Sequence, residues 1–195
     1  MTRGAWTFGF GAAFVTAAVL GCFDDAWGQT PILGIADSER PSVVAVRIDT
    51  SEAPTIDGDL SDPVWAKAAV LDDFRQMDPN TGQPATERTV LRILYDENNI
   101  YFAVYRYDRE PDKIIVRSMT RDGPVFAEDQ FRIALDPNMT RRDGYSFKVG
   151  PAGGREDALI QNNSLDLTRW NTIWVVRSRV VADGWMGGRD RDSVS

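Results

Sequence analysis

Carboxylates are the most numerous groups in this sequence that could carry out chemistry. The 195 residues include 29 Asp and Glu against 22 Lys and Arg, with one Cys and no His, for a formal charge of −7. Without an imidazole, Ser/His/Asp and Cys/His nucleophilic sites and His-ligated zinc are excluded. Two opposed carboxylates would suit glycoside hydrolysis, but nothing singles out one pair among so many acids. The acidic balance and the lack of a basic run argue against nucleic acid as a partner.

Three of these carboxylates lie close together just before a tryptophan. Asp57, Asp59 and Asp62 invite a calcium interpretation, but they lack the Gly and terminal Glu of an EF-hand loop. The Asp57-Gly58 dipeptide and the polar residues after it instead predict a tight turn. We expect that turn to point Trp65 inward, where a buried indole removes roughly 150–250 Å² from water. Asp57, Gly58 and Trp65 are therefore predicted to form a structural anchor.

Short segments with period-two alternation follow and predict β-strands. The clearest are Thr89–Tyr95 and Ile100–Tyr107, which four polar residues join as a hairpin. Both faces of the second segment are apolar, so we place it centrally in a sheet covered on both sides. Further strands are expected at 43–48, 71–77, 114–117, 130–136, 145–149 and 174–183, with helical turns at 64–70 and a break at 150–154. The chain is therefore predicted to be all-β, an antiparallel β-sandwich of immunoglobulin or jelly-roll type.

The first 28 residues have the composition of an export signal. Arg3 supplies a positive start, residues 5–20 carry no charge, and residues 26–28 form an A-x-G cleavage pattern. The alternative is a lipoprotein signal in which Cys22 is acylated. In either case we expect the protein to leave the cytoplasm and to be periplasmic, associated with the outer membrane or secreted. Residues 29–42 have no period and are predicted to be a linker.

Four motifs in the right order give the chain a family resemblance. The first has the pattern Ile-Asp-Gly-x-Leu-x-Asp-Pro-x-Trp, and the second spans the predicted hairpin. The motifs lie at Ile56–Trp65, Val90–Val104, Glu128–Pro137 and, as a group, Gly144–Val149, Trp170–Trp174 and Gly184-Trp185. Together they resemble family-9 carbohydrate-binding modules and the domain at the front of many bacterial outer-membrane proteins of unassigned function.

The resemblance implies where a sugar would bind. Such modules stack the apolar face of a pyranose on an aromatic ring and bind its hydroxyls with planar polar groups. Phe126 falls where the family has a tryptophan plate, Arg132 where it has a binding Glu, and Lys148 where it has an Arg. Only Lys148 keeps the charge type of the family residue.

Members of the family can also hold structural calcium. The candidate ligands that this implies are Glu128, Asp129 and Asp136. Turn and capping roles are equally open to these acids. No other cofactor is expected.

The C-terminal residues do not continue the family pattern. Where the family has a strand of the type Ala-Glu-x-x-Ile-Pro-Phe, residues 187–195 include four charged residues in a row and do not alternate between apolar and polar. One permitted codon set for 188–195, GGC CGA GAT CGC GAT TCC GTT TCG, encodes Ala-Glu-Ile-Ala-Ile-Pro-Phe when its first base is skipped, which suggests a frameshift. We therefore expect 43–186 to form a β-sandwich without its C-terminal strands, and 187–195 an aberrant tail. A solvated charged terminus is the alternative.

The sequence thus predicts an exported binding module that recognises a polysaccharide or oligosaccharide. Through the resemblance it is linked to carbohydrate catabolism by glycosyl hydrolases. No catalytic residue is assigned, and any hydrolysis of O-glycosyl bonds would belong to an associated domain. The alternative is a periplasmic front domain of an outer-membrane β-barrel protein that binds no sugar and has a structural or interaction role.

Overall fold

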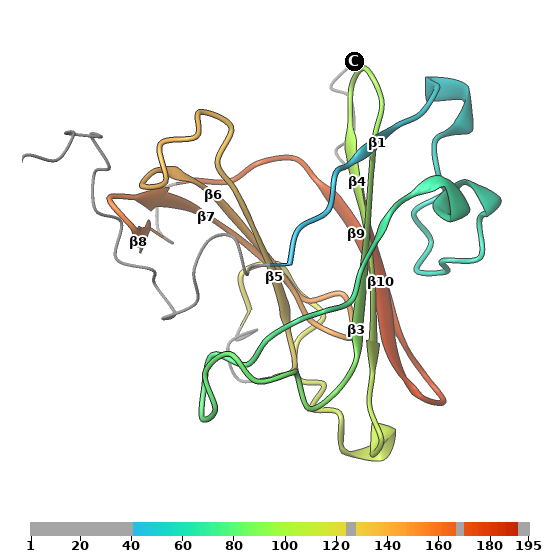
Figure 1. The fold of residues 1–195 in the computed structure, drawn as a ribbon, viewed down its shortest axis with the longest axis vertical. Helices are drawn as coiled ribbons and strands as arrows, with labels where there is room; N and C mark the ends of the chain where they lie inside the picture. The colour runs from blue at the N-terminus through green and yellow to red at the C-terminus, as the bar shows by residue number, and fades with distance from the viewer. Residues whose placement is uncertain (1–40, 124–127, 167–169, 191–195) are drawn as a thin grey trace, which may run out of the picture. The chain divides into compact units, whose positions relative to one another are not determined.

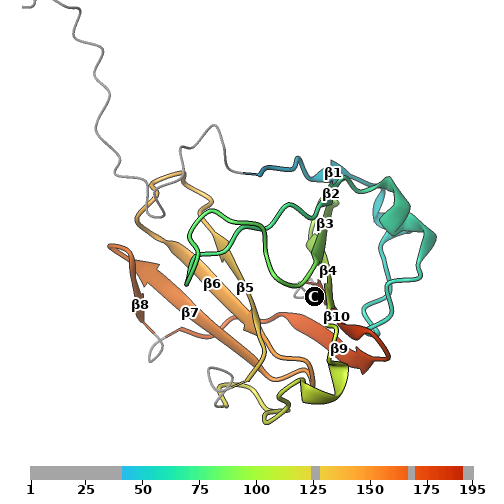
Figure 2. The same cartoon turned by 60° about the horizontal axis from the view of Figure 1, so that its bottom comes forward.

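The computed structural model describes residues 41–123, 128–166 and 170–190, which form two β-sheets (Figures 1 and 2). The first sheet comprises β1 (Val46–Arg47), β2 (Val70–Leu71), β3 (Thr89–Tyr95), β4 (Ile100–Tyr107), β9 (Val175–Val181) and β10 (Gly184–Asp190). The second comprises β5 (Phe131–Leu135), β6 (Gly144–Val149), β7 (Arg155–Gln161) and β8 (Ser164–Asp166). Short 3-10 helices lie between strands at η2 (Thr50–Glu52), η3 (Pro63–Lys67) and η4 (Pro111–Lys113). The predicted all-β sandwich is confirmed.

Strand β4 lies inside the first sheet, whose order is β1-β3-β4-β10-β9, with β2 also paired to β3. It forms an antiparallel hairpin with β3 at the bounds expected from the sequence, and its other edge pairs with β10. Four consecutive side chains, Tyr101, Phe102, Ala103 and Val104, are buried. Because successive side chains point to opposite faces, the sheet must be covered on both sides. The predicted central position of this strand is confirmed.

The segment around the anchor turn covers the outer face of the first sheet. Trp65, in η3, is 3 % exposed and packs in one cluster with Tyr101. Gly58 has a φ of +88°, a conformation that suits glycine, and the Asp57 carboxylate accepts a hydrogen bond of 2.7 Å from the amide of Asp59. The indole therefore points inward, and the carboxylate at the start of the turn satisfies the turn's own backbone.

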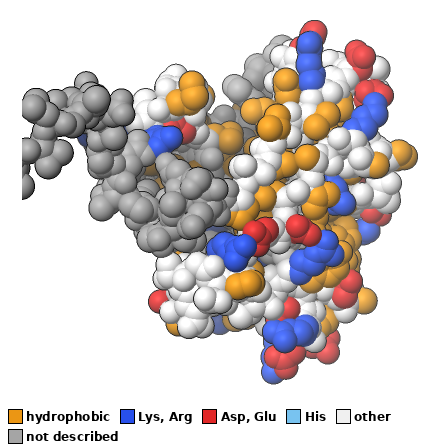
Figure 3. Space-filling view, viewed as in Figure 1, with side chains coloured by type: hydrophobic (Ala, Val, Ile, Leu, Met, Phe, Trp, Pro, Cys, Tyr) orange, Lys and Arg blue, Asp and Glu red, His pale blue; other side chains and the backbone are white. Residues whose placement is uncertain are grey.

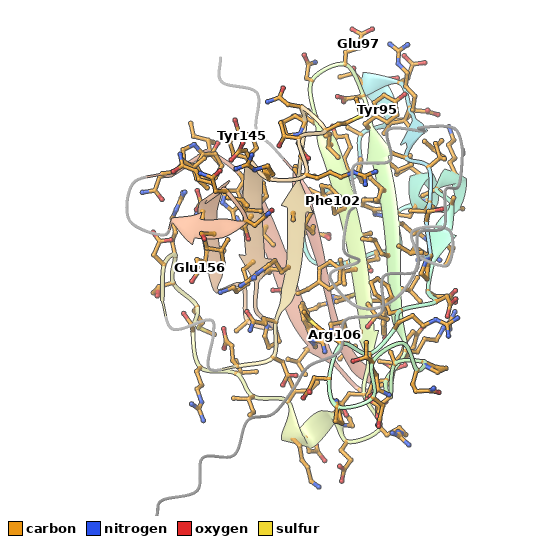
Figure 4. All side chains as sticks on the ribbon, turned by 60° about the vertical axis from the view of Figure 1, so that its left-hand side comes forward. Tyr95, Glu97, Phe102, Arg106, Tyr145 and Glu156 are labelled. Atoms are coloured by element: carbon orange, nitrogen blue, oxygen red, sulfur yellow. The ribbon has the colours of Figure 1, made fainter. Side chains whose placement is uncertain are left out.

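The second sheet covers the inner face of the first. In β5, Phe131 and Ile133 pack against Phe102 and Val104 of β4. Figure 4 shows Phe102 between the two sheets. In β6, Phe147 belongs to a further cluster that includes Trp174 and Trp185. The core of the sandwich therefore consists of inward-facing side chains from both sheets, as alternation along each strand requires.

Strands β7 and β8 were not predicted from the sequence. The segment Arg155–Gln161 begins with three charged residues and does not alternate, but all but its last residue pair with β6. A two-residue turn, Asn162-Asn163, with φ values of 49° and 63°, then returns the chain into β8. Asparagine tolerates this left-handed conformation, which suits two-residue hairpins. The available edge of β6 thus overrides a weak local pattern.

The expected strand at 114–117 is wrong, and the one at 71–77 is mostly wrong. The amides of Ile115 and Arg117 donate hydrogen bonds to the carboxylates of Asp129 and Glu128, at 2.9 and 2.6 Å, so that segment has side-chain partners in place of a strand neighbour. In the second segment only Leu71 belongs to a strand, β2, and Arg75 makes an isolated bridge with Pro84. Strand β1 pairs with β3 in parallel, not antiparallel, since the long anchor segment after it allows the chain to reverse before β2.

Strand β10 continues to Asp190, so the boundary expected at 186 lies inside it. Its residues up to Arg189 pair with β4 and those up to Asp190 pair with β9. The expectation that 187–190 lie outside the sandwich is therefore wrong. Backbone hydrogen bonds on both edges form a strand there without an alternating side-chain pattern. Residues 191–195 lie outside the described residues.

Charges of both signs are interspersed on the face drawn in Figure 3. Among the described residues, several charged side chains form exposed ion pairs, such as Arg88 with Asp72 at 2.9 Å and Arg75 with Asp73 at 2.7 Å. Such pairs contribute little to stability because water screens them. Among the described residues, no helix is long and apolar enough to span a membrane.

The buried indole of Trp65 yields a test of the outer layer. We expect Trp65→Ala to lower the free energy of unfolding by about 3–5 kcal/mol, because the cavity it leaves lies under a turn that cannot collapse fully. Urea unfolding of the full chain measures this change. Val44→Ala, at a side chain that is 82 % exposed, is the control and should change stability by less than about 0.5 kcal/mol. Equal effects of the two variants would contradict the packing described here.

Candidate functional site

The sequence-predicted residues Arg132 and Lys148 lie opposite each other on β5 and β6. Glu156 of β7 continues this row, and directly opposed residues share one face of a sheet. Their neighbours in β5 and β6 point into the core, so the row lies on the outer face of the second sheet; Figure 4 shows where Glu156 lies. Lys148 is 4 % exposed, and its Nζ is 2.6 Å from Glu156 Oε1, whereas Arg132 is exposed. Phe126 lies outside the described residues.

The acids named as calcium candidates are not brought together. Glu128 Oε2 accepts hydrogen bonds from the amides of Arg117 and Ser118, at 2.6 and 3.0 Å. Asp136, beyond the other end of β5, accepts one from the amide of Thr140 at 3.1 Å. Backbone hydrogen bonds, above all the one from Arg141, lower the pKa of Asp136 and outweigh the opposing effect of desolvation. Within the described residues no group of three or more metal-ligating side chains occurs.

A cavity of about 520 Å³ opens where one end of the first sheet meets the second. We call it the end cavity. Figure 4 shows Glu97 and Tyr145 at this end of the molecule and Arg106 towards the other. Its lining residues are Asp96, Glu97, Asn98, Asn99, Ile100, Leu135, Pro137, Tyr145, Phe147, Trp170 and Thr172. The lining therefore combines aromatic rings with a polar hairpin loop.

Aromatic rings form one wall of the end cavity. The rings of Tyr145 and Trp170 lie 4.9 Å apart between centroids at an angle of 31°, and Trp170 meets Phe147 edge-on at 5.9 Å. Tyr145 and Phe147 point to the same side of β6 because they are two residues apart. Both Tyr145 and Trp170 are only partly buried. These rings offer apolar surface at the mouth of the cavity.

The β3–β4 loop forms the polar wall. Asp96 is buried and accepts hydrogen bonds from the amides of Asn98 and Asn99, both at 2.7 Å, and from the Tyr101 hydroxyl at 2.8 Å. Burial favours the neutral carboxyl, but these hydrogen bonds together outweigh it and lower the pKa of Asp96. The loop is therefore held in one conformation by a single carboxylate.

Two side-chain amides of this loop have hydrogen-bonding capacity that the described residues do not use. Asn99 donates from Nδ2 to the Tyr101 hydroxyl at 3.1 Å, while its Oδ1 is buried without a hydrogen-bond partner among the described residues. Asn98 is exposed, and its side chain makes no hydrogen bond to another described residue. Because Asn99 Oδ1 has almost no exposed surface, the exposed amide of Asn98 is the one that a ligand can reach.

A buried ion pair fixes the segment that carries Trp170. Arg121 Nη2 lies 2.7 and 2.8 Å from the two carboxylate oxygens of Asp157 in β7, and it also donates to the carbonyl of Thr172 at 2.8 Å. The amide of Thr172 in turn donates to Asp157 at 2.7 Å. Asp157 thus holds both backbone groups of a residue that lines the end cavity, directly or through Arg121.

Sequence reasoning did not find the end cavity. The sequence places Asn98 and Asn99 in a hairpin connection and Tyr145 in a strand. It singles out Trp170 only as part of a family motif. The three segments lie far apart in the chain, and no spacing in the sequence links them. Two of the residues that the resemblance did indicate, Arg132 and Lys148, are not among the lining residues.

Comparisons with known proteins agree with this fold. Residues 56–151 match a family model described as "Carbohydrate family 9 binding domain-like". Residues 56–151 therefore form a domain like those of that carbohydrate-binding family. A family 9 carbohydrate-binding module from Caldicellulosiruptor kristjanssonii, solved with cellotriose, is 15 % identical with a TM-score of 0.50, over 76 % of this chain and 67 % of that one.

A second solved structure, from Bacteroides uniformis, is of a protein to which carbohydrate binding has been ascribed. It is 11 % identical with a TM-score of 0.57, over 77 % of this chain and 75 % of that one. At these identities the likeness establishes the sandwich fold. No curated protein matches the sequence.

The buried carboxylate of Asp157 allows a test of the segment that carries Trp170. We expect Asp157→Asn to lower the free energy of unfolding by about 2–3 kcal/mol, because Arg121 and the Thr172 amide lose a charged acceptor. Asp72→Asn removes an Arg-paired carboxylate that is exposed, so it is the matched control and should cost less than about 1 kcal/mol. Urea unfolding measures both.

The lowered pKa of Asp96 leads to a pH prediction. Because the folded-state pKa lies below the ordinary value of 3.8, Asp96 stabilises the folded protein above that pH and loses this effect as pH falls further. The difference in unfolding free energy between the protein and Asp96→Asn should therefore stay constant from pH 7 to about pH 4 and shrink below it. A difference that already shrinks between pH 7 and pH 5 would show that the hydrogen bonds to Asp96 are not the cause.

Proposed function

We propose that this domain binds a glycan in the end cavity. The observation that carries the proposal is that a tilted aromatic wall, Tyr145 and Trp170, and a polar loop with the exposed amide of Asn98 line one cavity. A pyranose has one apolar face and a rim of hydroxyls, so it needs both kinds of surface at once. The family match supports the same class of ligand.

Each wall has a separate part in binding. The apolar face of a sugar ring stacks on Tyr145 or Trp170, and its hydroxyls reach the loop that Asp96 holds in place. There Asn98 offers an exposed amide that both donates hydrogen bonds to hydroxyls and accepts hydrogen bonds from them. Because Asp96 fixes the loop and Asp157 fixes the Trp170 segment, little ordering is required on binding.

The proposed role is recognition of glycan outside the cytoplasm. The composition of the first 28 residues supports export. The domain would bring an associated glycosidase or membrane protein to its polysaccharide and would hydrolyse no bond itself. The related module solved with cellotriose suggests a neutral oligosaccharide as the first probe.

Isothermal titration calorimetry of the full chain with cellotriose and a panel of mono- and oligosaccharides tests this. We expect Tyr145→Ala and Trp170→Ala each to weaken binding tenfold or more, because each removes stacking surface. Asn98→Ala, at an exposed loop position, should weaken it several-fold without affecting the fold. Tyr95→Ala changes an exposed tyrosine at the same end of the molecule that does not line the cavity, and it should bind as the unchanged protein does.

Two results would count against the proposal in different ways. Absence of binding across the whole panel would favour the structural or interaction role. Loss of binding in Arg132→Ala, with Tyr145→Ala and Asn98→Ala unaffected, would move the site to the outer face of the second sheet that the family resemblance implies.

A further inference from the structure

A second cavity, of about 490 Å³, adjoins the end cavity. It lies along the β5–β6 and β7–β8 turns, and its lining includes Asn138, Asp143, Gln161 and Asn162. Pro137 and Tyr145 line both cavities. The aromatic ring proposed as a stacking surface is thus shared by two adjacent spaces. The two cavities are therefore neighbours on either side of Pro137 and Tyr145.

The second cavity is built with a defined shape. Asp143 Oδ1 accepts a hydrogen bond from the Asn162 amide at 2.9 Å, and the Asn163 amide donates to the Arg142 carbonyl at 2.8 Å. These bonds tie the β5–β6 loop to the β7–β8 turn. Four residues of the two loops, Met139, Arg141, Asn162 and Asn163, have positive φ values between 49° and 63°. The network between the loops holds this uncommon backbone in place.

Two side-chain amides on this wall are unused. Asn138 and Gln161 are exposed and make no side-chain hydrogen bond to any other described residue. An amide can donate and accept, so it suits hydroxyl groups better than it suits apolar or singly charged ligands. With Asn98 in the end cavity, the two spaces present free amides on both sides of Tyr145.

The charges of the lining are one-sided. Asp96, Glu97 and Asp143 are acidic, and none of the described residues that line the two cavities is Lys or Arg. The nearby cations are engaged at the margins: Arg47 pairs with Glu97 at 3.0 Å, and Arg142 donates to Asn162 Oδ1. An anionic glycan would therefore meet like charge without a free cation in the lining to offset it.

We propose that the two cavities form one continuous groove for a neutral glycan chain of several units, with Tyr145 as the stacking surface between adjacent subsites. This inference rests on the proposed function and extends it: the ligand is a chain that runs across Tyr145, not a single terminal sugar. Uncharged hydroxyls match the free amides on either side. Uronic acid or sulfated units are disfavoured by the acidic lining.

Chain length separates this inference from the proposed function. Calorimetry of the full chain uses gluco-, xylo- and manno-oligosaccharides of one to four β-1,4-linked units, with an oligogalacturonate of four units as the anionic probe. In the series that binds best, we expect the four-unit chain to bind at least tenfold more tightly than the single sugar. We expect the oligogalacturonate to bind at least tenfold more weakly than the neutral chain of equal length.

Variants in the second cavity locate the added affinity. Asn138→Ala and Gln161→Ala should each weaken binding of the four-unit chain about threefold or more and leave binding of the single sugar unchanged. Asn80→Ala and Gln83→Ala alter the same residue types at exposed positions in another loop, so they are matched controls and should change neither.

The outcomes are distinct. Equal affinity for one and four units, or no effect of Asn138→Ala and Gln161→Ala on the long chain, would overturn the groove while glycan binding in the end cavity stands. Oligogalacturonate bound as tightly as the neutral chain would overturn the charge preference. Failure of every probe to bind would refute the proposed function, and the groove with it.

Discussion

Burial of β4 on both of its faces is the constraint on which the rest of this structure depends. Tyr101 packs with Trp65 on the outer side, while Phe102 and Val104 pack with β5 on the inner side. Neither layer alone would bury four consecutive side chains, because alternation sends every second one to the other face. The anchor turn and the second sheet are therefore both needed. The loop between β3 and β4 forms the polar wall of the end cavity. Its position follows from the packing of β4 between the anchor segment and the second sheet.

The end cavity exists because two buried carboxylates hold irregular chain in place. Asp96 accepts hydrogen bonds from backbone amides of its own loop. Asp157 accepts one from the Thr172 amide, and Arg121 donates one to the Thr172 carbonyl. Each satisfies backbone groups that would otherwise lie unpaired in or near the core, which is the usual requirement for irregular structure in such places. The first set of hydrogen bonds orders the polar loop, and the second orders the backbone of Thr172 close to Trp170. Rigidity at both walls reduces the ordering cost of binding a ligand between them.

The roles of some candidate residues depend only on their neighbours in the sequence, whereas the roles of others depend on strands from distant parts of the chain. Residues near the anchor act locally, and the turn that Asp57 and Gly58 form is visible in the dipeptide itself. Lys148 is different: its position on a face of β6 follows from alternation, but its pairing with Glu156 depends on β7, a strand that the local pattern does not predict. The site residues of the end cavity are more dependent still, since they come from three separate parts of the chain.

The amino-acid sequence by itself determined the sandwich class, the β3–β4 hairpin with its bounds, the inward position of Trp65 and the family resemblance. These depend on patterns within ten or so residues, where alternation and turn chemistry act directly. The tertiary structure alone decided that Arg155–Asp166 forms two strands, that β10 runs to Asp190, and that Asn99, Tyr145 and Trp170 line one cavity. A strand with a weak pattern forms when a neighbour offers an open edge, and a cavity forms where separate segments stop short of each other. Neither condition can be recognised from the residues of a single segment of the chain.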